Sequence, residues 1–440
     1  MNTKERILSG HFEKTLNEPL SDLSLFQSGK LAATGTGKLS INVDGQLLIE
    51  AIAEVTPHRI GSHAQRGVII PDAEYYDLIA KTCDGLTVKA DKLVETSIRY
   101  SDKPTEVDFK PTMVTISSSR NTDCKSSFEV FASPYDCRFY NKATRQNKVN
   151  PVFEDSTIGR WFGMEKTDVV VGLRGNSNSR LHLRVNSKIA TDESLEKHAA
   201  AFLDVLKFSI GKELECLAHV QIAPTSEKIV LFGCESTKPM RFYPPIPDHE
   251  HKAAAKLLER GMDFFLRKDC GPVLTALHVC WESRKITFPA NCLLVCSVVE
   301  GLADYILRDA INQCHALRDL ALELLRKESK SKESPYFHEV EKNIKSVEFL
   351  KSKESIRKAA ELLRISVTPT ELGAWGHLRN RLAHGNIGLE STSRDYLQIE
   401  FDRAAAVANI ANKFILALIG YDGPYRNYAE RGHPIQNFPA

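Results

Sequence analysis

The sequence TPTELGAWGHLRNRLAHG, residues 368–385, predicts one well-delimited helix. Thr368 is suited to cap it, Pro369 fits the first helical position, and Glu371 follows the cap by three residues, which is the pattern of a capping box. Gly385 is suited to end the helix in a left-handed conformation. We therefore expect the helix to run from Pro369 to His384, the residue before this glycine.

The faces of this helix differ in polarity. At 100° per residue, four apolar side chains fall on one stripe: Leu372, Trp375, Leu378 and Leu382. Arg379 lies at the edge of that stripe, where a cation needs a partner or an interface. Asn380 and His384 are one turn apart on a polar face. The sequence therefore gathers Arg379, Asn380 and His384 at the C-terminal end of the helix.

The motif RNRLAH, residues 379–384, resembles the Arg–polar–x3–His motif of the HEPN superfamily. The segment IGYDGPYRNY, from Ile419, looks like the end of ApeA-like HEPN proteins. The resemblance covers residues 250–440 and, in architecture only, residues 1–240. It implies a helical-bundle domain, commonly dimeric, that acts as a metal-independent endoribonuclease after a β-rich domain. It further implies anti-phage defence by abortive infection, with transfer RNA as one candidate substrate.

The three residue types at the helix end suit cleavage of RNA by its own 2′-hydroxyl. A base must remove the hydroxyl proton, and a histidine titrates near neutrality. An arginine stays charged and can hold two phosphate oxygens, while an asparagine can orient the base or the substrate. We therefore take Arg379, Asn380 and His384 as candidate catalytic residues, with no metal or cofactor required.

Three further residues are candidates for substrate binding: Arg381, His377 and Glu300. The expected partners are RNA, a second copy of the chain through the C-terminal helical domain, and a phage-derived trigger at the N-terminal domain.

A structural alternative remains open for the same motif. Arg379 could pair inside the bundle with a carboxylate such as Glu300, which interrupts the apolar run CLLVCSVVEGLADY. His384 could serve only as a cation at a helix C-terminus, where the helix dipole favours it. The corresponding alternative function is a non-catalytic HEPN binding module that assembles with a partner protein.

The first half of the chain reads as β. Asp44-Gly45 separates two runs of alternating apolar residues, which predicts a hairpin. The sequence TGTGKLS, residues 34–40, lacks the pattern of a phosphate-binding loop and predicts a turn. Other strands are predicted at 86–90, 112–117, 128–132, 168–173, 181–185 and 228–232, with one helix at 195–208.

The second half reads as helical. Helices are predicted at 251–267, 271–282, 289–309, 312–328, 335–348, 353–364, 369–384 and 402–419. The fold class is therefore α+β: a β-rich antiparallel N-terminal domain at 1–240, a proline-rich linker at 241–251, and an all-α HEPN-type helical bundle at 252–440.

Composition and charge argue against several other classes of protein. A net charge of +2 over 440 residues sets up no global field for nucleic acid. Neither a secretory leader nor an apolar run of about 18–20 residues is evident, so we expect a cytoplasmic protein without membrane contact. The ten cysteines form no CxxC pair, and Cys292 and Cys296 fit reduced core thiols.

Overall fold

The chain forms two compact units of different secondary structure. The computed structural model describes residues 17–41, 46–55, 74–99, 105–119, 126–134, 158–163, 167–174, 180–187, 192–214, 216–223, 225–232, 242–247, 250–328, 335–345, 352–383 and 393–439. One unit comprises Met1–Leu203 with Leu214–Pro239, and the other comprises Asp204–Glu213 with Met240–Ala440. The first is β-rich and the second helical, which confirms the α+β class.

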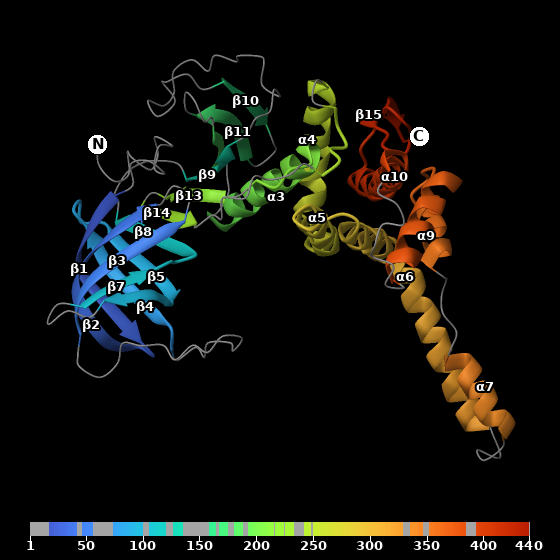
Figure 1. Ribbon diagram of the computed structural model, residues 1–440, viewed down its shortest axis with the longest axis horizontal. Helices are drawn as coiled ribbons and strands as arrows, with labels where there is room; N and C mark the ends of the chain where they lie inside the picture. Colours follow the sequence, from blue (N-terminus) through green and yellow to red (C-terminus); the bar gives the residue numbers. More distant parts are fainter. Residues whose placement is uncertain are drawn as a thin grey trace. The chain divides into compact units, whose positions relative to one another are not determined.

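A single antiparallel sheet makes up most of the first unit. Its strands are β1 (Asn17–Gln27), β2 (Lys30–Ile41), β3 (Leu47–Val55), β4 (Tyr76–Thr82), β5 (Thr87–Leu93), β6 (Glu95–Arg99), β7 (Thr105–Phe109), β8 (Met113–Ser119), β9 (Ser127–Pro134), β10 (Ile158–Gly163), β11 (Thr167–Arg174), β12 (Arg180–Ser187), β13 (Cys216–Ile222) and β14 (Ser226–Phe232). Their order is β10-β11-β12-β9-β13-β14-β8-β5-β4-β1-β2-β3-β7-β6. In Figure 1 the strands β1 to β5 curl around a shared interior.

Alternating burial explains why these segments form strands. Along β4 every second side chain, beginning with Tyr76, is buried, as expected for a sheet with one face on the core. The predicted hairpin is confirmed, because β2 and β3 pair with Ile41 opposite Leu47. The residues of its turn, Asp44-Gly45, lie outside the described residues.

Residues 34–40 are not a turn, contrary to the sequence prediction, because they lie within β2. The backbone of the neighbouring strand β3 runs so close to Gly35 and Gly37 that a side chain at either position would clash with it. A Cβ at Gly35 would meet the carbonyl oxygen of Ile52, and one at Gly37 would lie 2.7 Å from the carbonyl oxygen of Glu50. The glycines therefore permit close strand approach rather than chain reversal.

The other predicted strands and the helix α3 (Asp192–Ile210) are confirmed. Within the first unit, six of the described strands were not predicted: β1, β4, β6, β7, β10 and β13. In β1, Pro19 and Asp22 are residues typical of loops, and the strand accommodates Asp22 at a positive φ of 47° beside a register shift.

The second unit contains the helices α4 (His251–Phe265), α5 (Gly271–Ser283), α6 (Ala290–Glu328), α7 (Pro335–Lys345), α8 (Ser352–Leu362), α9 (Pro369–Ala383) and α10 (Arg394–Ile419), with the 3-10 turn η4 (Lys268–Cys270). A hairpin of β15 (Gly423–Arg426) and β16 (Ile435–Phe438) follows, so this unit is not all-α as predicted.

Three helix predictions need correction. The helices predicted at 289–309 and 312–328 are one helix, α6, because no glycine or proline interrupts the chain between them. The last helix begins at Arg394 rather than near residue 402, with the hydroxyl of Ser393 accepting a hydrogen bond from the Tyr396 amide.

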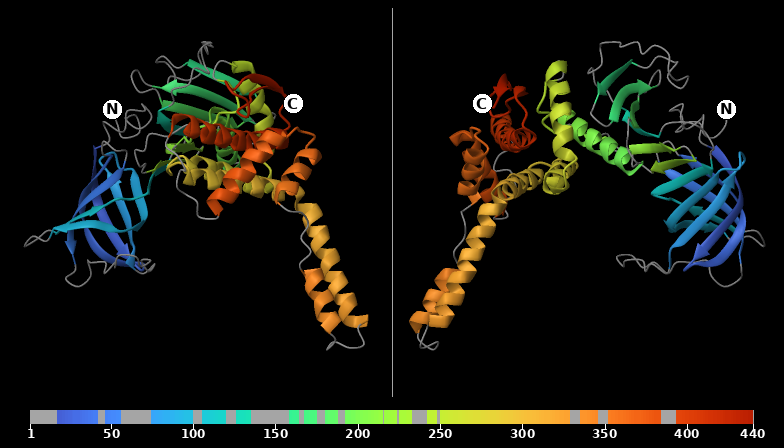
Figure 2. Two further views of the ribbon diagram at one scale, coloured as in Figure 1. Left: turned by 45° about the vertical axis from the view of Figure 1, so that its right-hand side comes forward. Right: turned by 180° about the vertical axis from the view of Figure 1, so that it is seen from behind.

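Helix α6 is the central element of the second unit. It contacts α5, α8, α9 and α10, and its distal part pairs with α7 in an arm that extends from the other helices (Figure 2). By length and composition α6 could also cross a membrane, contrary to the expectation of no such segment, and 44% of its apolar window is buried in the structure. Cys292 and Cys296 are buried free thiols.

Part of the segment at 241–251, predicted as a linker, packs within the helical unit. Phe242 and Ile246 are buried. The carbonyl oxygen of Pro244 accepts a hydrogen bond from the Tyr428 hydroxyl (2.9 Å), and that of Pro245 accepts one from the Arg426 amide (2.8 Å). These prolines therefore hold the start of the unit against the β15–β16 hairpin.

Candidate functional site

Helix α9 is fixed at its N-terminal end by the predicted capping box. The amide of Thr368 donates to Glu371 Oε2 (2.7 Å), and the amide of Glu371 donates to Thr368 Oγ1 (3.2 Å). Each side chain satisfies a backbone donor that the helix leaves free. The capping box is confirmed, and it sets the position of everything that follows along α9.

The Glu371 carboxylate also anchors α9 to α10. It is fully buried, and its Oε1 lies 2.9 Å from Lys413 Nζ and accepts a hydrogen bond of 2.9 Å from Asn409 Nδ2. Asn409 also donates to Asn427 Oδ1 and accepts from the Tyr428 amide. This buried polar network ties α9, α10 and the C-terminal hairpin together.

The apolar stripe of α9 faces the core, as predicted. Leu372, Trp375 and Leu378 are buried, and Trp375 Nε1 donates to the carbonyl oxygen of Cys296 on α6 (3.4 Å). The side chain of Leu382 lies outside the described residues. Packing on one side and the cap at one end therefore hold α9 rigidly against α6 and α10.

At the other end of α9, two of the motif residues, Arg379 and Asn380, are accessible. Arg379 is half-buried, with 38% of its side chain exposed, and its Nε donates to Glu300 Oε1 of α6 (2.8 Å). Asn380 is exposed. His384 lies outside the described residues. The structure thus brings Arg379 and Glu300 together, as the structural alternative expects.

The Arg379–Glu300 pair fixes the direction of the guanidinium without using all of its donors. A guanidinium carries five N–H groups, and the contact to Glu300 involves Nε. Because both side chains are partly exposed, the pair contributes little to stability and can be rearranged by a charged ligand. The terminal nitrogens remain suited to bind a phosphate.

Arg381 lies in a different environment, which argues against the substrate contact expected for it. It is buried; its Nη1 lies 3.0 Å from Glu400 Oε2 of α10 and donates to the Tyr396 hydroxyl (2.8 Å). A buried arginine paired with a fully buried carboxylate holds α9 to α10. Arg379 and Arg381 are two residues apart and point to different partners.

His377 belongs to the same Glu400 cluster. Its Nε2 lies 3.3 Å from Glu400 Oε1 and 2.8 Å from Arg403 Nη1, while 38% of its side chain is exposed. Arg403 also pairs with Glu400, three residues before it on α10. The sequence did not single out Glu400 or Arg403, whose i,i+3 spacing is common on helix surfaces.

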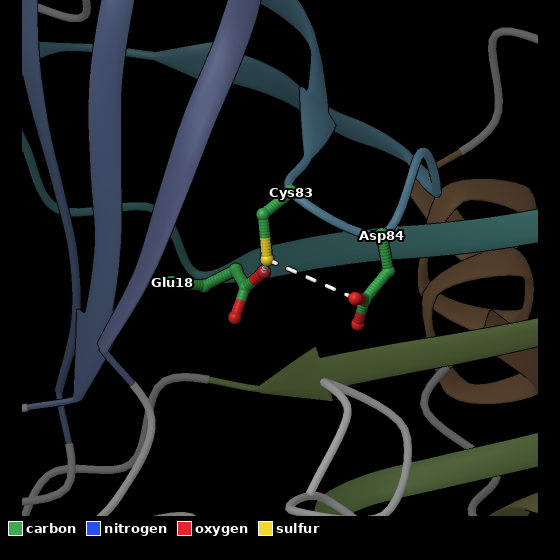
Figure 3. Close-up of side chains that lie close together, drawn as sticks. All are labelled: Glu18, Cys83 and Asp84. Carbon is green, nitrogen blue, oxygen red and sulfur yellow. Dashed lines mark hydrogen bonds between the residues drawn. The ribbon is translucent and has the colours of Figure 1, made fainter.

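Two groups of three residues have the composition of a metal site. Glu18, Cys83 and Asp84 gather beside the β4–β5 turn, where Cys83 Sγ lies 3.1 Å from Glu18 Oε1 and 3.9 Å from Asp84 Oδ1; Figure 3 shows the three side chains.

The second group, Glu213, His278 and Glu282, lies in the helical unit. Lys285 Nζ lies 2.6 Å from Glu282 and 3.8 Å from Glu213, so a cation already balances the two carboxylates. Neither group carries a functional assignment.

Comparison with known proteins does not extend this picture. No protein-family model, no curated protein and no solved structure matches the chain, so its function is argued from the residues and geometry of α9.

Proposed function

We propose that the helical unit is a HEPN-type, metal-independent endoribonuclease. The observation that carries the proposal is the exposed end of α9, where Arg379 and Asn380 are accessible on a rigid helix that leads directly into His384. A capped and packed helix is the kind of support that a catalytic group needs. The motif at residues 379–384 supplies the remaining support through its resemblance to HEPN ribonucleases.

In the proposed reaction the 2′-hydroxyl of RNA attacks the adjacent phosphorus. His384 accepts the hydroxyl proton, the O2′–P bond forms, and the P–O5′ bond breaks. The products are a 2′,3′-cyclic phosphate and a 5′-hydroxyl, the latter after a proton reaches the leaving oxygen. Arg379 stabilises the charge on the phosphoryl oxygens, and Asn380 orients His384 or the substrate.

Protonation of the leaving oxygen calls for a second acid. We propose that it comes from His384 of a second copy, in a homodimer formed through the helical unit. Twofold dimers place equivalent residues near each other at the axis. A trigger-sensing role for the β-rich unit, a cytoplasmic setting in anti-phage defence and transfer RNA as the substrate complete the proposal, and these rest on the resemblance alone.

A second candidate function is a non-catalytic binding module that assembles with a partner protein. The ion pair between Arg379 and Glu300 favours it, because a cation already satisfied by a carboxylate needs no phosphate. The two functions differ in what His384 does, and a cleavage assay separates them.

The decisive experiment incubates the purified full chain with total RNA, with and without EDTA, and identifies the product ends. We expect cleavage in EDTA that leaves 2′,3′-cyclic phosphates, and loss of cleavage in His384→Ala. His315→Ala, at an exposed position on α6, serves as the matched control and should cleave like wild type. Activity restored only by Mg²⁺, or wild-type activity in His384→Ala, would refute the proposal.

A mixing experiment tests the shared site. If both chains contribute to each site, excess inactive His384→Ala protein should lower the activity per wild-type chain. Activity that tracks only the amount of wild-type chain, in a sample that is monomeric by light scattering, would rule out the shared site.

A further inference from the structure

A cavity of about 380 Å³ lies in the helical unit beside the apolar stripe of α9. Its wall is built from the segment before α4, the connection between α5 and α6, and the adjoining faces of α6, α9 and α10. Leu378, the residue before Arg379, forms part of the wall. The volume lies within the range of small-molecule sites, toward its lower end.

The cavity lining combines aromatic rings with positive charge. Four aromatic side chains line it: Phe242, Tyr243, Phe288 and Phe401. Two cations, Arg284 and Lys285, line it as well, and among the described residues that form the wall there is no carboxylate. Such a lining favours a ligand that carries both a planar ring and a negative charge.

Arg284 differs from the other two arginines of this region. Arg379 and Arg381 each pair with a carboxylate, Glu300 and Glu400 respectively. In the described part of the chain Arg284 pairs with no carboxylate, and its Nε, like that of Arg381, is buried without a hydrogen-bond acceptor. A partly buried guanidinium without a counter-ion is costly unless an anion accompanies it.

Arg284 is nevertheless held in place. Its Cζ lies 5.6 Å from the centre of the Tyr243 ring, a cation–π distance. Burial raises the pKa of Tyr243, and the hydrogen-bonded guanidinium partly opposes that shift. Lys285 differs, because Glu282 and Glu213 already flank it. Arg284 is therefore the group in this cavity that calls for an anionic ligand.

The aromatic wall offers a stacking surface. The rings of Phe288 and Phe401 stack at 4.5 Å between centroids and 29° between planes. Phe401 is 47% exposed, so part of the stack faces outward. Asn291 and Thr287, which also line the cavity, carry donors and acceptors able to read the edge of a base.

We propose that this cavity binds a nucleotide, with the base against Phe288 and Phe401 and the phosphate at Arg284. Every base has a face that can stack, and an arginine matches a phosphate with two hydrogen bonds. The nucleotide is either free or part of an RNA strand, and these two sources share the chemistry. Binding at this cavity does not depend on the cleavage reaction, so it can be tested separately.

The test measures binding to the full chain by calorimetry, with AMP, GMP, CMP and UMP as ligands. We expect saturable binding of at least one of them, and binding about tenfold or more weaker for the matching nucleoside and for inorganic phosphate. Equal affinity for the nucleotide and for inorganic phosphate would overturn the assignment, as would no saturable binding of any mononucleotide.

Variants locate the site. Arg284→Gln and Phe401→Ala should each weaken binding about tenfold, whereas Arg357→Gln on the surface of α8 should not. Circular dichroism checks that each variant is folded. Wild-type affinity in a folded Arg284→Gln variant would refute the placement.

An uncleavable 2′-O-methyl oligonucleotide distinguishes the two sources. Tighter binding of the oligonucleotide than of the mononucleotide, lost in Arg284→Gln, identifies a strand as the ligand. Binding of the mononucleotide alone identifies a free nucleotide.

Discussion

Each end of α9 carries an ion pair, and the two pairs differ in burial. At the N-terminal end, Glu371 is buried and bonded to Thr368, Asn409 and Lys413. At the C-terminal end, Arg379 has one carboxylate partner and is partly open to solvent. A buried and fully bonded ion pair fixes the fold, while a half-exposed pair can be rearranged by a ligand. Burial, more than charge, therefore separates structural from functional residues on this helix.

The largest effect is expected at the buried end. Glu371→Ala leaves the ammonium of Lys413 buried without its carboxylate and removes the helix cap, and it should lower the free energy of unfolding by about 3–5 kcal/mol. Urea unfolding followed by circular dichroism measures this. Glu354→Ala, which removes an exposed pair with Arg357, is the matched control and should cost less than about 1 kcal/mol. Equal losses in the two variants would contradict the comparison.

At the exposed end we expect a small effect on stability and a large effect on RNA cleavage. Arg379→Ala should change the free energy of unfolding by no more than about 1 kcal/mol, because an exposed pair contributes little. If Arg379 stabilises the transition state, RNA cleavage should fall about 10²–10³-fold, as on loss of one charge-stabilising donor. Single-turnover kinetics with RNA measure the loss. A stable variant that cleaves at the wild-type rate would show that Arg379 is structural only.

Features of the fold that depend on residues close together in the sequence were predicted. The buried contacts that fix α9 to α10, between residues far apart in the sequence, were not. The capping box of Thr368 and Glu371 and the apolar stripe of α9 are local, and both are confirmed. The pairing of Glu371 with Lys413, 42 residues away, depends on how α9 packs on α10. No local sequence pattern predicts such a pair.

In the candidate site, one pair of distant residues was anticipated and another was not. The edge position of Arg379 followed from helix geometry, and the ion pair with Glu300 was considered because that residue interrupts an apolar run. The burial of Arg381 was not foreseen, because its carboxylate, Glu400, lies on another helix. Spacing along α9 could not distinguish the roles of two arginines two residues apart.

Replacing Arg381 should change stability by an amount between the effects expected at the two ends of α9. Arg381→Ala removes one cation from the buried Glu400 carboxylate, but Arg403 and His377 remain beside it. We expect a loss of about 2 kcal/mol in the free energy of unfolding, below the range for an unrelieved buried charge. Urea unfolding measures this loss, and cleavage should fall only as far as the folded fraction does. Cleavage lost from a fully folded variant would restore the substrate-binding role.

The smallest effect is expected in the β-rich unit, where burial acts on a histidine. Burial, with Lys228 adding to it, lowers the pKa of His219 on β13 from 6.5 to about 4. Below pH 6.5 the unfolded chain therefore binds a proton that the folded unit does not, so stability is full above this pH and falls as the pH drops toward 4. Because His219 is only half-buried, solvent screening reduces the effect, and we expect a loss of about 1 kcal/mol between pH 7 and pH 5. Urea unfolding at the two pH values, in wild type and in His219→Gln, measures it. The variant should be less sensitive to acid than wild type. An equal acid response in wild type and in His219→Gln would show that burial of His219 does not make the stability of this unit pH-dependent.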